Sequence, residues 1–153
     1  MFTTSLQFFT FATYVAFIAY RYGIQRSVSH SYYLIKHQWL FTVVMWIVGI
    51  CQCFHADLHP LFFLSGAGLC FLGAANAFND LRMTYRAHLV GTVTAIVAGI
   101  VAFLFLLPSP IVAANLLITI PIAIYFFVKK TWVWWLECYY VLVFSIFLML
   151  LHS

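Results

Sequence analysis

The chain has 153 residues, of which 66% are hydrophobic and only 7% are charged. Soluble domains typically carry about 25% charged residues, so this composition excludes an ordinary water-soluble fold and predicts an integral membrane protein. The length fits a single transmembrane domain, residues 1–153, without a separate soluble module.

Apolar segments long enough for helical spans recur along the whole chain. A helix needs about 20 residues to cross the hydrocarbon core of a bilayer, with about 17 as the lower limit. The first segment is expected to be a retained span. A secretory signal opens with a positively charged region, whereas no basic residue precedes Arg21 here. Pro60 and Pro110 open later segments, and Pro121 predicts a kink inside another. The sequence thus predicts an all-α bundle with six transmembrane helices, at roughly 3–20, 38–54, 60–78, 88–107, 110–128 and 132–151.

The basic residues predict how the chain crosses the membrane. All seven lie in alternate connections: Arg21, Arg26 and Lys36 after the first span, Arg82 and Arg86 after the third, and Lys129 and Lys130 after the fifth. Because Lys and Arg mark cytoplasmic loops, both termini are expected outside (N-out, C-out) and these three connections inside. The positive charge then reflects topology and contact with anionic lipid headgroups, and nucleic-acid binding is not expected.

Small residues recur at helical spacing in two of the predicted spans. They are Gly66, Cys70, Gly73 and Ala77 in the third span, and Gly91, Ala95, Ala98 and Ala102 in the fourth. Helices in lipid associate through such stripes because small residues let the backbones approach closely. Both stripes are expected to pack inward, which would carry Asp80 and His88 to the inner end of the bundle.

Glu137 is an acidic residue placed within the last apolar span. Glu137, Val141, Ser145 and Leu148 share one helix face. An ionised carboxylate at this depth costs a few kcal/mol on insertion scales, about 2.5–3.5, so it should face the interior or water and have a partner.

Three separate regions therefore deliver polar groups to the inner side, where they predict a binding cavity. The candidate ligand- or ion-binding residues are Ser27, Ser29, His30, Tyr33, His37, Asn79, Asp80, His88 and Glu137. Structural alternatives stay open: the serines could satisfy backbone groups in a turn, and Asp80 could pair with a nearby arginine. His88 could cap a helix start, and Glu137 could bond a loop lysine.

A second polar cluster follows the second span, on the predicted outer side. It contains Cys51, Cys53, His55, Asp57 and His59, all residue types that bind zinc or copper. The C-x-C and H-x-D-x-H spacings match no established zinc pattern, and an ordinary polar loop is the alternative. A divalent metal is the cofactor that such a site would require.

The stretch from Arg26 to His37 includes "SVSHSYY", and later parts of the chain read "FLSGAGLCFLGAANAFND", then His88 and "WWLE". These residues resemble an uncharacterised family of short polytopic bacterial and phage membrane proteins. The resemblance covers most of the chain and implies the bacterial cytoplasmic (inner) membrane, but it transfers no activity. A more distant analogy is with ceramidase and adiponectin-receptor-type membrane hydrolases, which hold zinc with Ser, Asp and His. This chain lacks the H-x-x-x-H of their last helix and has Glu137 instead.

Three functions remain open at this point. The first is a channel- or transporter-like protein, expected to be a homo-oligomer, that binds an ion, a proton or a small polar ligand at the inner cavity. The second is a metal-dependent intramembrane lipid hydrolase using His88, Asp80, His30 or His37, and Glu137. The third is a non-catalytic effector or partner-recruiting subunit that acts through its basic loops. Whether the protein is an enzyme is left undecided.

Overall fold

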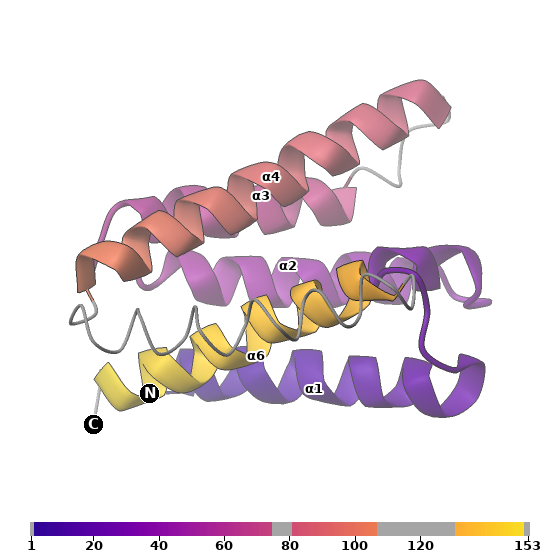
Figure 1. The fold of residues 1–153 in the computed structure, drawn as a ribbon, viewed down its shortest axis with the longest axis horizontal. Helices are drawn as coiled ribbons and strands as arrows, with labels where there is room; N and C mark the ends of the chain where they lie inside the picture. Colours follow the sequence, from indigo (N-terminus) through magenta and orange to yellow (C-terminus); the bar gives the residue numbers. More distant parts are fainter. Residues whose placement is uncertain (1, 75–80, 107–130, 152–153) are drawn as a thin grey trace.

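The computed structural model describes residues 2–74, 81–106 and 131–151, which form an all-helical arrangement (Figure 1). This confirms the predicted all-α class. The elements are α1 (Phe2–Tyr22), the short 3-10 helix η1 (Ser29–Tyr33), α2 (Trp39–Cys53), α3 (Leu61–Ala74), α4 (Leu81–Leu106) and α6 (Trp132–Leu151). The predicted fifth span, residues 110–128 with Pro121, lies outside the described residues, as do Asn79, Asp80, Lys129 and Lys130.

Three of the described helices are long and apolar enough to cross a membrane: Phe2–Tyr22, Met83–Leu106 and Trp132–Leu150. Helices α2 and α3 are apolar but shorter, with 15 and 14 residues. Large apolar side chains such as Phe9, Val97 and Phe105 are exposed on the outside of the bundle, as expected for a surface that faces lipid. The chain therefore has the features of a helical membrane protein.

Helix α4 begins at Leu81 rather than at residue 88, where the apolar segment begins. The helix continues through the polar residues Arg82 and Arg86, which fall outside the most apolar stretch. Hydropathy marks where a helix enters lipid, whereas the helix itself can extend into the polar interface with its backbone hydrogen bonds intact. The span predicted at roughly 88–107 therefore marks the apolar part of α4, and the helix begins earlier, at Leu81.

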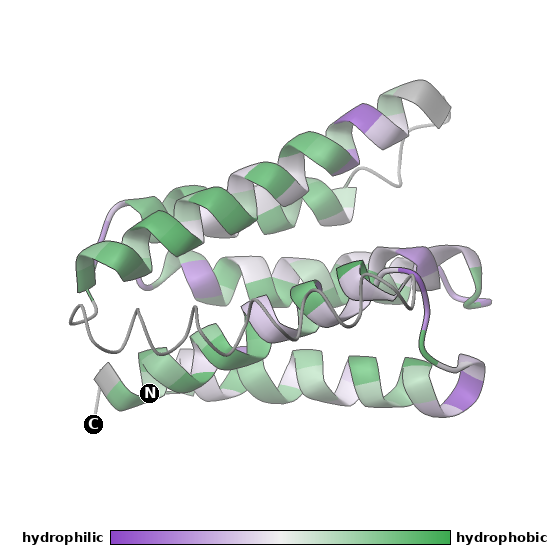
Figure 2. Ribbon diagram, in the orientation of Figure 1, coloured by the Kyte–Doolittle hydropathy of each residue, from purple (hydrophilic) through white to green (hydrophobic). Residues whose placement is uncertain are grey.

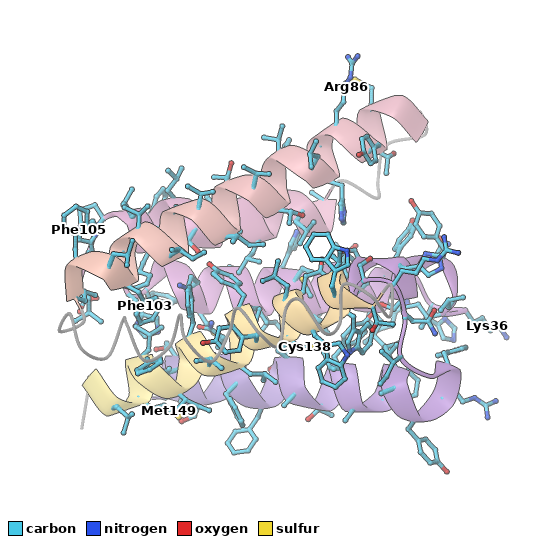
Figure 3. The ribbon with its side chains drawn as sticks, in the orientation of Figure 1. Lys36, Arg86, Phe103, Phe105, Cys138 and Met149 are labelled. Atoms are coloured by element: carbon cyan, nitrogen blue, oxygen red, sulfur yellow. The ribbon has the colours of Figure 1, made fainter. Side chains whose placement is uncertain are left out.

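The helices pack in the order α4, α3, α2, α1 and α6, each against the next, and lie lengthwise beside one another (Figure 1). The start of α1 and the end of α6 lie at one end of the bundle, and η1 lies at the other. Hydrophilic residues gather at the η1 end and on the first part of α4 (Figure 2). Lys36 and Arg86 extend from this end (Figure 3). We call it the basic end.

Glycines bring the middle helices into backbone contact. A Cβ atom on Gly49 of α2 would lie 2.6 Å from the carbonyl oxygen of Gly66 in α3, and one on Gly91 of α4 would lie 2.8 Å from the backbone nitrogen of Leu72. Gly68, which the sequence stripe omitted, packs against Ala95 of α4 in the same way. Helix α3 therefore uses small residues on two faces, one toward α2 and one toward α4.

The stripe predicted on α4 is buried as expected, with Ala95, Ala98 and Ala102 at most 5% exposed. Helix α6 meets α4 differently, through large aromatic side chains. The ring centroids of Phe103 and Phe144 lie 4.1 Å apart.

Candidate functional site

The connection after α1 folds over the first turns of α6 at the basic end. Its turn is closed by its own serines: Ser27 Oγ accepts the backbone N–H of His30 at 3.1 Å, and Ser31 Oγ donates to the Val28 carbonyl at 2.5 Å. Ser31 also lies 2.5 Å from the hydroxyl of Tyr14 on α1. Ser27 and Ser31 therefore hydrogen-bond to backbone groups of their own turn. This is the structural role that the sequence analysis gave as the alternative to ligand binding.

Glu137 joins this connection to α6 through hydrogen bonds from its side-chain carboxylate. Its Oε2 accepts the backbone N–H of Val28 at 2.6 Å, and its Oε1 accepts the Ser29 hydroxyl at 3.0 Å. The N–H of Trp134, one of the first-turn groups that no helix can pair internally, donates to the Arg26 carbonyl at 3.2 Å. The carboxylate thus faces the bundle, and Val141, Ser145 and Leu148 on the same face are buried.

A cavity of about 30 Å³ lies beside this carboxylate. By the same measure a water molecule requires roughly 10–15 Å³, so the cavity is large enough for one or two water-sized groups. Its lining comes from η1, from the residue that precedes η1, and from all five described α-helices. The lining residues are Phe11, Val28, Ser29, Phe41, Met45, Leu69, Leu72, Thr92, Ala95, Ile96, Glu137, Tyr140 and Val141.

Four of the lining residues carry polar side chains: Ser29, Thr92, Glu137 and Tyr140. The hydroxyl oxygen of Thr92 is buried and has no hydrogen-bond partner among the described residues. Buried hydroxyls are normally paired, and Thr92 lines the cavity, which makes this oxygen a candidate contact for a ligand there. The site combines the Glu137 carboxylate, held by Val28 and Ser29, with a Thr92 hydroxyl that has no partner among the described residues, and most of the remaining lining is apolar.

Tyr140 belongs to a second network that the sequence reading missed. Its hydroxyl lies 2.5 Å from Ser65 Oγ of α3 and 2.7 Å from the carbonyl oxygen of Ala95 on α4. Gly99 makes room for the ring, because a Cβ atom there would lie 2.9 Å from Tyr140 Cε2. A serine and a tyrosine inside apolar spans were the available signal, since polar groups at membrane depth need partners from other helices.

Several predicted site residues do not reach the cavity. His30 is half-buried, with its ring 6.0 Å from that of the exposed Tyr33, and His37 is exposed. His88 is half-buried on α4, one turn before Thr92, and is not part of the lining. Among the described candidates, the structure brings together Ser29 and Glu137.

The predicted metal cluster at the other end is not supported. Cys51, Cys53, His55, Asp57 and His59 all lie in the described part of the chain, and no group of three or more His, Cys, Asp or Glu side chains there is arranged to hold a metal ion. Helix α2 ends at Cys53, so Cys51 and Cys53 lie on the helix, whereas His55, Asp57 and His59 lie in the connection that follows it.

Each of three members of that cluster has a separate contact. His55 Nε2 lies 3.3 Å from Thr4 Oγ1, whereas His59 Nδ1 accepts the backbone N–H of Leu61 at 3.3 Å. Cys53 donates its thiol hydrogen to the carbonyl of Phe63. A shared metal would require these side chains to converge, and they diverge instead.

No family model matches the chain, and neither does any curated protein or any solved structure. The function is therefore inferred from the chemistry of the site.

Proposed function

We propose that the protein is a small channel- or transporter-like membrane protein that binds a proton or small cation at Glu137. The observation that carries the proposal is the position of this carboxylate, on an apolar helix and beside an internal cavity. Acidic side chains at membrane depth are costly, by about 2.5–3.5 kcal/mol on insertion scales, and usually mark ion or proton pathways.

The size and lining of the cavity favour a small ligand. A volume of about 30 Å³ leaves no room for a lipid chain or a sugar. Carboxylate and hydroxyl oxygens from Glu137, Ser29 and Thr92 are suited to a proton, a water molecule or a hard cation. The remaining lining is mainly apolar, which strengthens electrostatic attraction because it excludes bulk water.

The membrane arrangement proposed with this function has six spans, both termini outside and the basic end in the cytoplasm of a bacterial cell. The described basic residues Arg21, Arg26, Lys36 and Arg86 support this orientation, since all belong to the end of α1, its connection or the start of α4. The cavity then lies nearer the cytoplasmic side. A homo-oligomer is part of the proposal, because lipid-facing helices in so small a protein offer surface for self-association.

Glu137→Gln tests the proposal in proteoliposomes loaded with a pH- or cation-sensitive dye. Glutamine keeps the side-chain size and one acceptor oxygen for Ser29, but it cannot ionise. Flux driven by a membrane potential should fall by about tenfold or more, equivalent to at least about 1.4 kcal/mol on the barrier.

Asp57→Asn is the matched control, because it removes one negative charge from an exposed position in the turn after α2. Flux through this variant should equal that of the unmodified protein. If Glu137→Gln and Asp57→Asn both transport at the original rate, Glu137 is not the binding group and the proposal is wrong.

A further inference from the structure

Four buried polar side chains lie between α1 and the end of α2, at the end of the bundle opposite the basic end. They are Thr4, Gln7, Gln52 and His55, each at most 2% exposed, and we call them the outer polar cluster. Gln7 Nε2 donates to Gln52 Oε1 at 2.9 Å, and Thr4 Oγ1 lies 3.3 Å from His55 Nε2. The cluster therefore consists of two polar layers, about one helical turn apart.

The glutamine pair keeps hydrogen-bonding capacity that nothing in the described part of the chain uses. Gln7 Oε1 and Gln52 Nε2 are both buried, and neither has a partner among the described residues. Each such group costs about 1–3 kcal/mol when left unpaired, so two apolar residues would stabilise this contact better. One free acceptor beside one free donor is suited to a ligand that both donates and accepts, such as water or hydronium.

One face of α1 links this cluster to the Glu137 site. Its buried residues are Thr4, Gln7, Phe11, Tyr14 and Ile18. Tyr14 meets Ser31 in the connection, whose neighbouring residues bind Glu137. Between Gln7 and Tyr14 the α1 backbone rises about 10 Å at 1.5 Å per residue.

Phe11 fills that interval. It is 1% exposed and also lines the cavity beside Glu137, so it separates the two polar regions. Apolar constrictions of this kind close a path by excluding water, and they open it when their side chains move aside.

We infer that the outer polar cluster and the Glu137 cavity are the two halves of one proton path, with Phe11 as the apolar gate between them. This inference rests on the proposed function and narrows its ligand to the proton. Amide, hydroxyl and imidazole groups hold water in hydrogen-bonded chains along which a proton moves without any covalent change in the protein. The charge carried by each proton is balanced by a counter-ion that crosses the membrane separately.

The test uses proteoliposomes with a trapped pH-sensitive dye and a potassium diffusion potential set by valinomycin. The double variant Gln7→Leu with Gln52→Leu should fold, because replacing both hydrogen-bonding partners by apolar groups is close to neutral for stability. Its proton uptake should fall about tenfold or more, since the outer half can no longer hold water.

Phe11→Ala should increase the rate severalfold by opening the apolar layer. Phe9→Ala is its matched control, since it removes the same side chain from a position that is 65% exposed on the outside of α1. Phe9→Ala should leave the rate unchanged. If the double variant does not fold, this pair decides: equal rates for Phe11→Ala and Phe9→Ala overturn the inference.

The outcomes separate the two proposals. Proton flux that depends on Glu137 but is unaffected by the double variant and by Phe11→Ala overturns the outer path and leaves the proposed function standing. Flux of sodium or potassium without protons overturns the proton path alone. Flux that does not depend on Glu137, or no flux of any cation, overturns both.

Discussion

Ser29→Ala is the sharpest test of how the connection after α1 holds the carboxylate. Ser29 is 7% exposed and donates its hydroxyl hydrogen to Glu137 Oε1 at 3.0 Å. Alanine removes this donor without adding volume or changing the 3-10 turn. Two other links stay in place: the Val28 N–H to Glu137 Oε2, and the Trp134 N–H to the Arg26 carbonyl.

The expected loss follows from the chemistry of the lost bond. A hydrogen bond to a charged group contributes about 1.5–3 kcal/mol, compared with about 0.5–1.5 kcal/mol for one between neutral groups. Because two links remain, the connection should stay docked on α6 and the loss should fall near the lower bound. We expect a decrease of about 1.5 kcal/mol in the free energy of unfolding.

The measurement is a titration of the protein in mixed micelles with a denaturing detergent, followed by tryptophan fluorescence. Trp134 is 1% exposed beside the site and is one of five tryptophans, so the summed emission follows unfolding of the bundle and includes the loss of packing at the site. Ser27→Ala is the matched control, since Ser27 Oγ accepts one neutral backbone N–H, from His30 at 3.1 Å. The reasoning is refuted if Ser29→Ala unfolds with the stability of the unmodified protein, or if Ser27→Ala costs more.

Two further predictions use the same titration. Gly91→Ala should lower the free energy of unfolding by about 1–3 kcal/mol, because the new methyl group meets the α3 backbone and forces the helices apart. Val97→Ile is the control, since it adds a carbon on the exposed face of α4, and it should change the free energy of unfolding by less than about 0.5 kcal/mol. Tyr140→Phe removes the hydroxyl that joins α6 to Ser65 and the Ala95 carbonyl, and should cost about 1 kcal/mol. Unchanged stability in Tyr140→Phe would mean that this three-helix network does not form in the membrane.

The sequence determined the helical class and much of the local pattern. The segments expected at roughly 3–20 and 132–151 correspond closely to α1 and α6. The stripe on α4 is buried as expected, and so are Val141 and Ser145, which share a helix face with the half-buried Glu137. These features repeat with the period of the helix, so each can be read from a short stretch without knowing what lies opposite.

How far a helix continues beyond its apolar stretch could not be predicted from hydropathy, for a physical reason. Apolar content reports contact with lipid, whereas helical hydrogen bonds form within a segment whether or not its side chains are solvated. The first part of α4 contains Arg82, Tyr85 and Arg86 in helical backbone, and hydropathy alone gave no sign of it.

Only the tertiary structure decided which groups meet. The sequence predicted that Glu137 lies on the same side of the membrane as the first connection. Its closest partner, however, is the backbone N–H of Val28, an apolar residue that a search for polar side chains does not find. The pairing of Gln7 with Gln52 depends on how α1 and α2 rotate about their axes and at what height they pack. Those quantities follow from the fit of whole helix surfaces, to which residues far apart in the chain contribute, so no local stretch of sequence contains them.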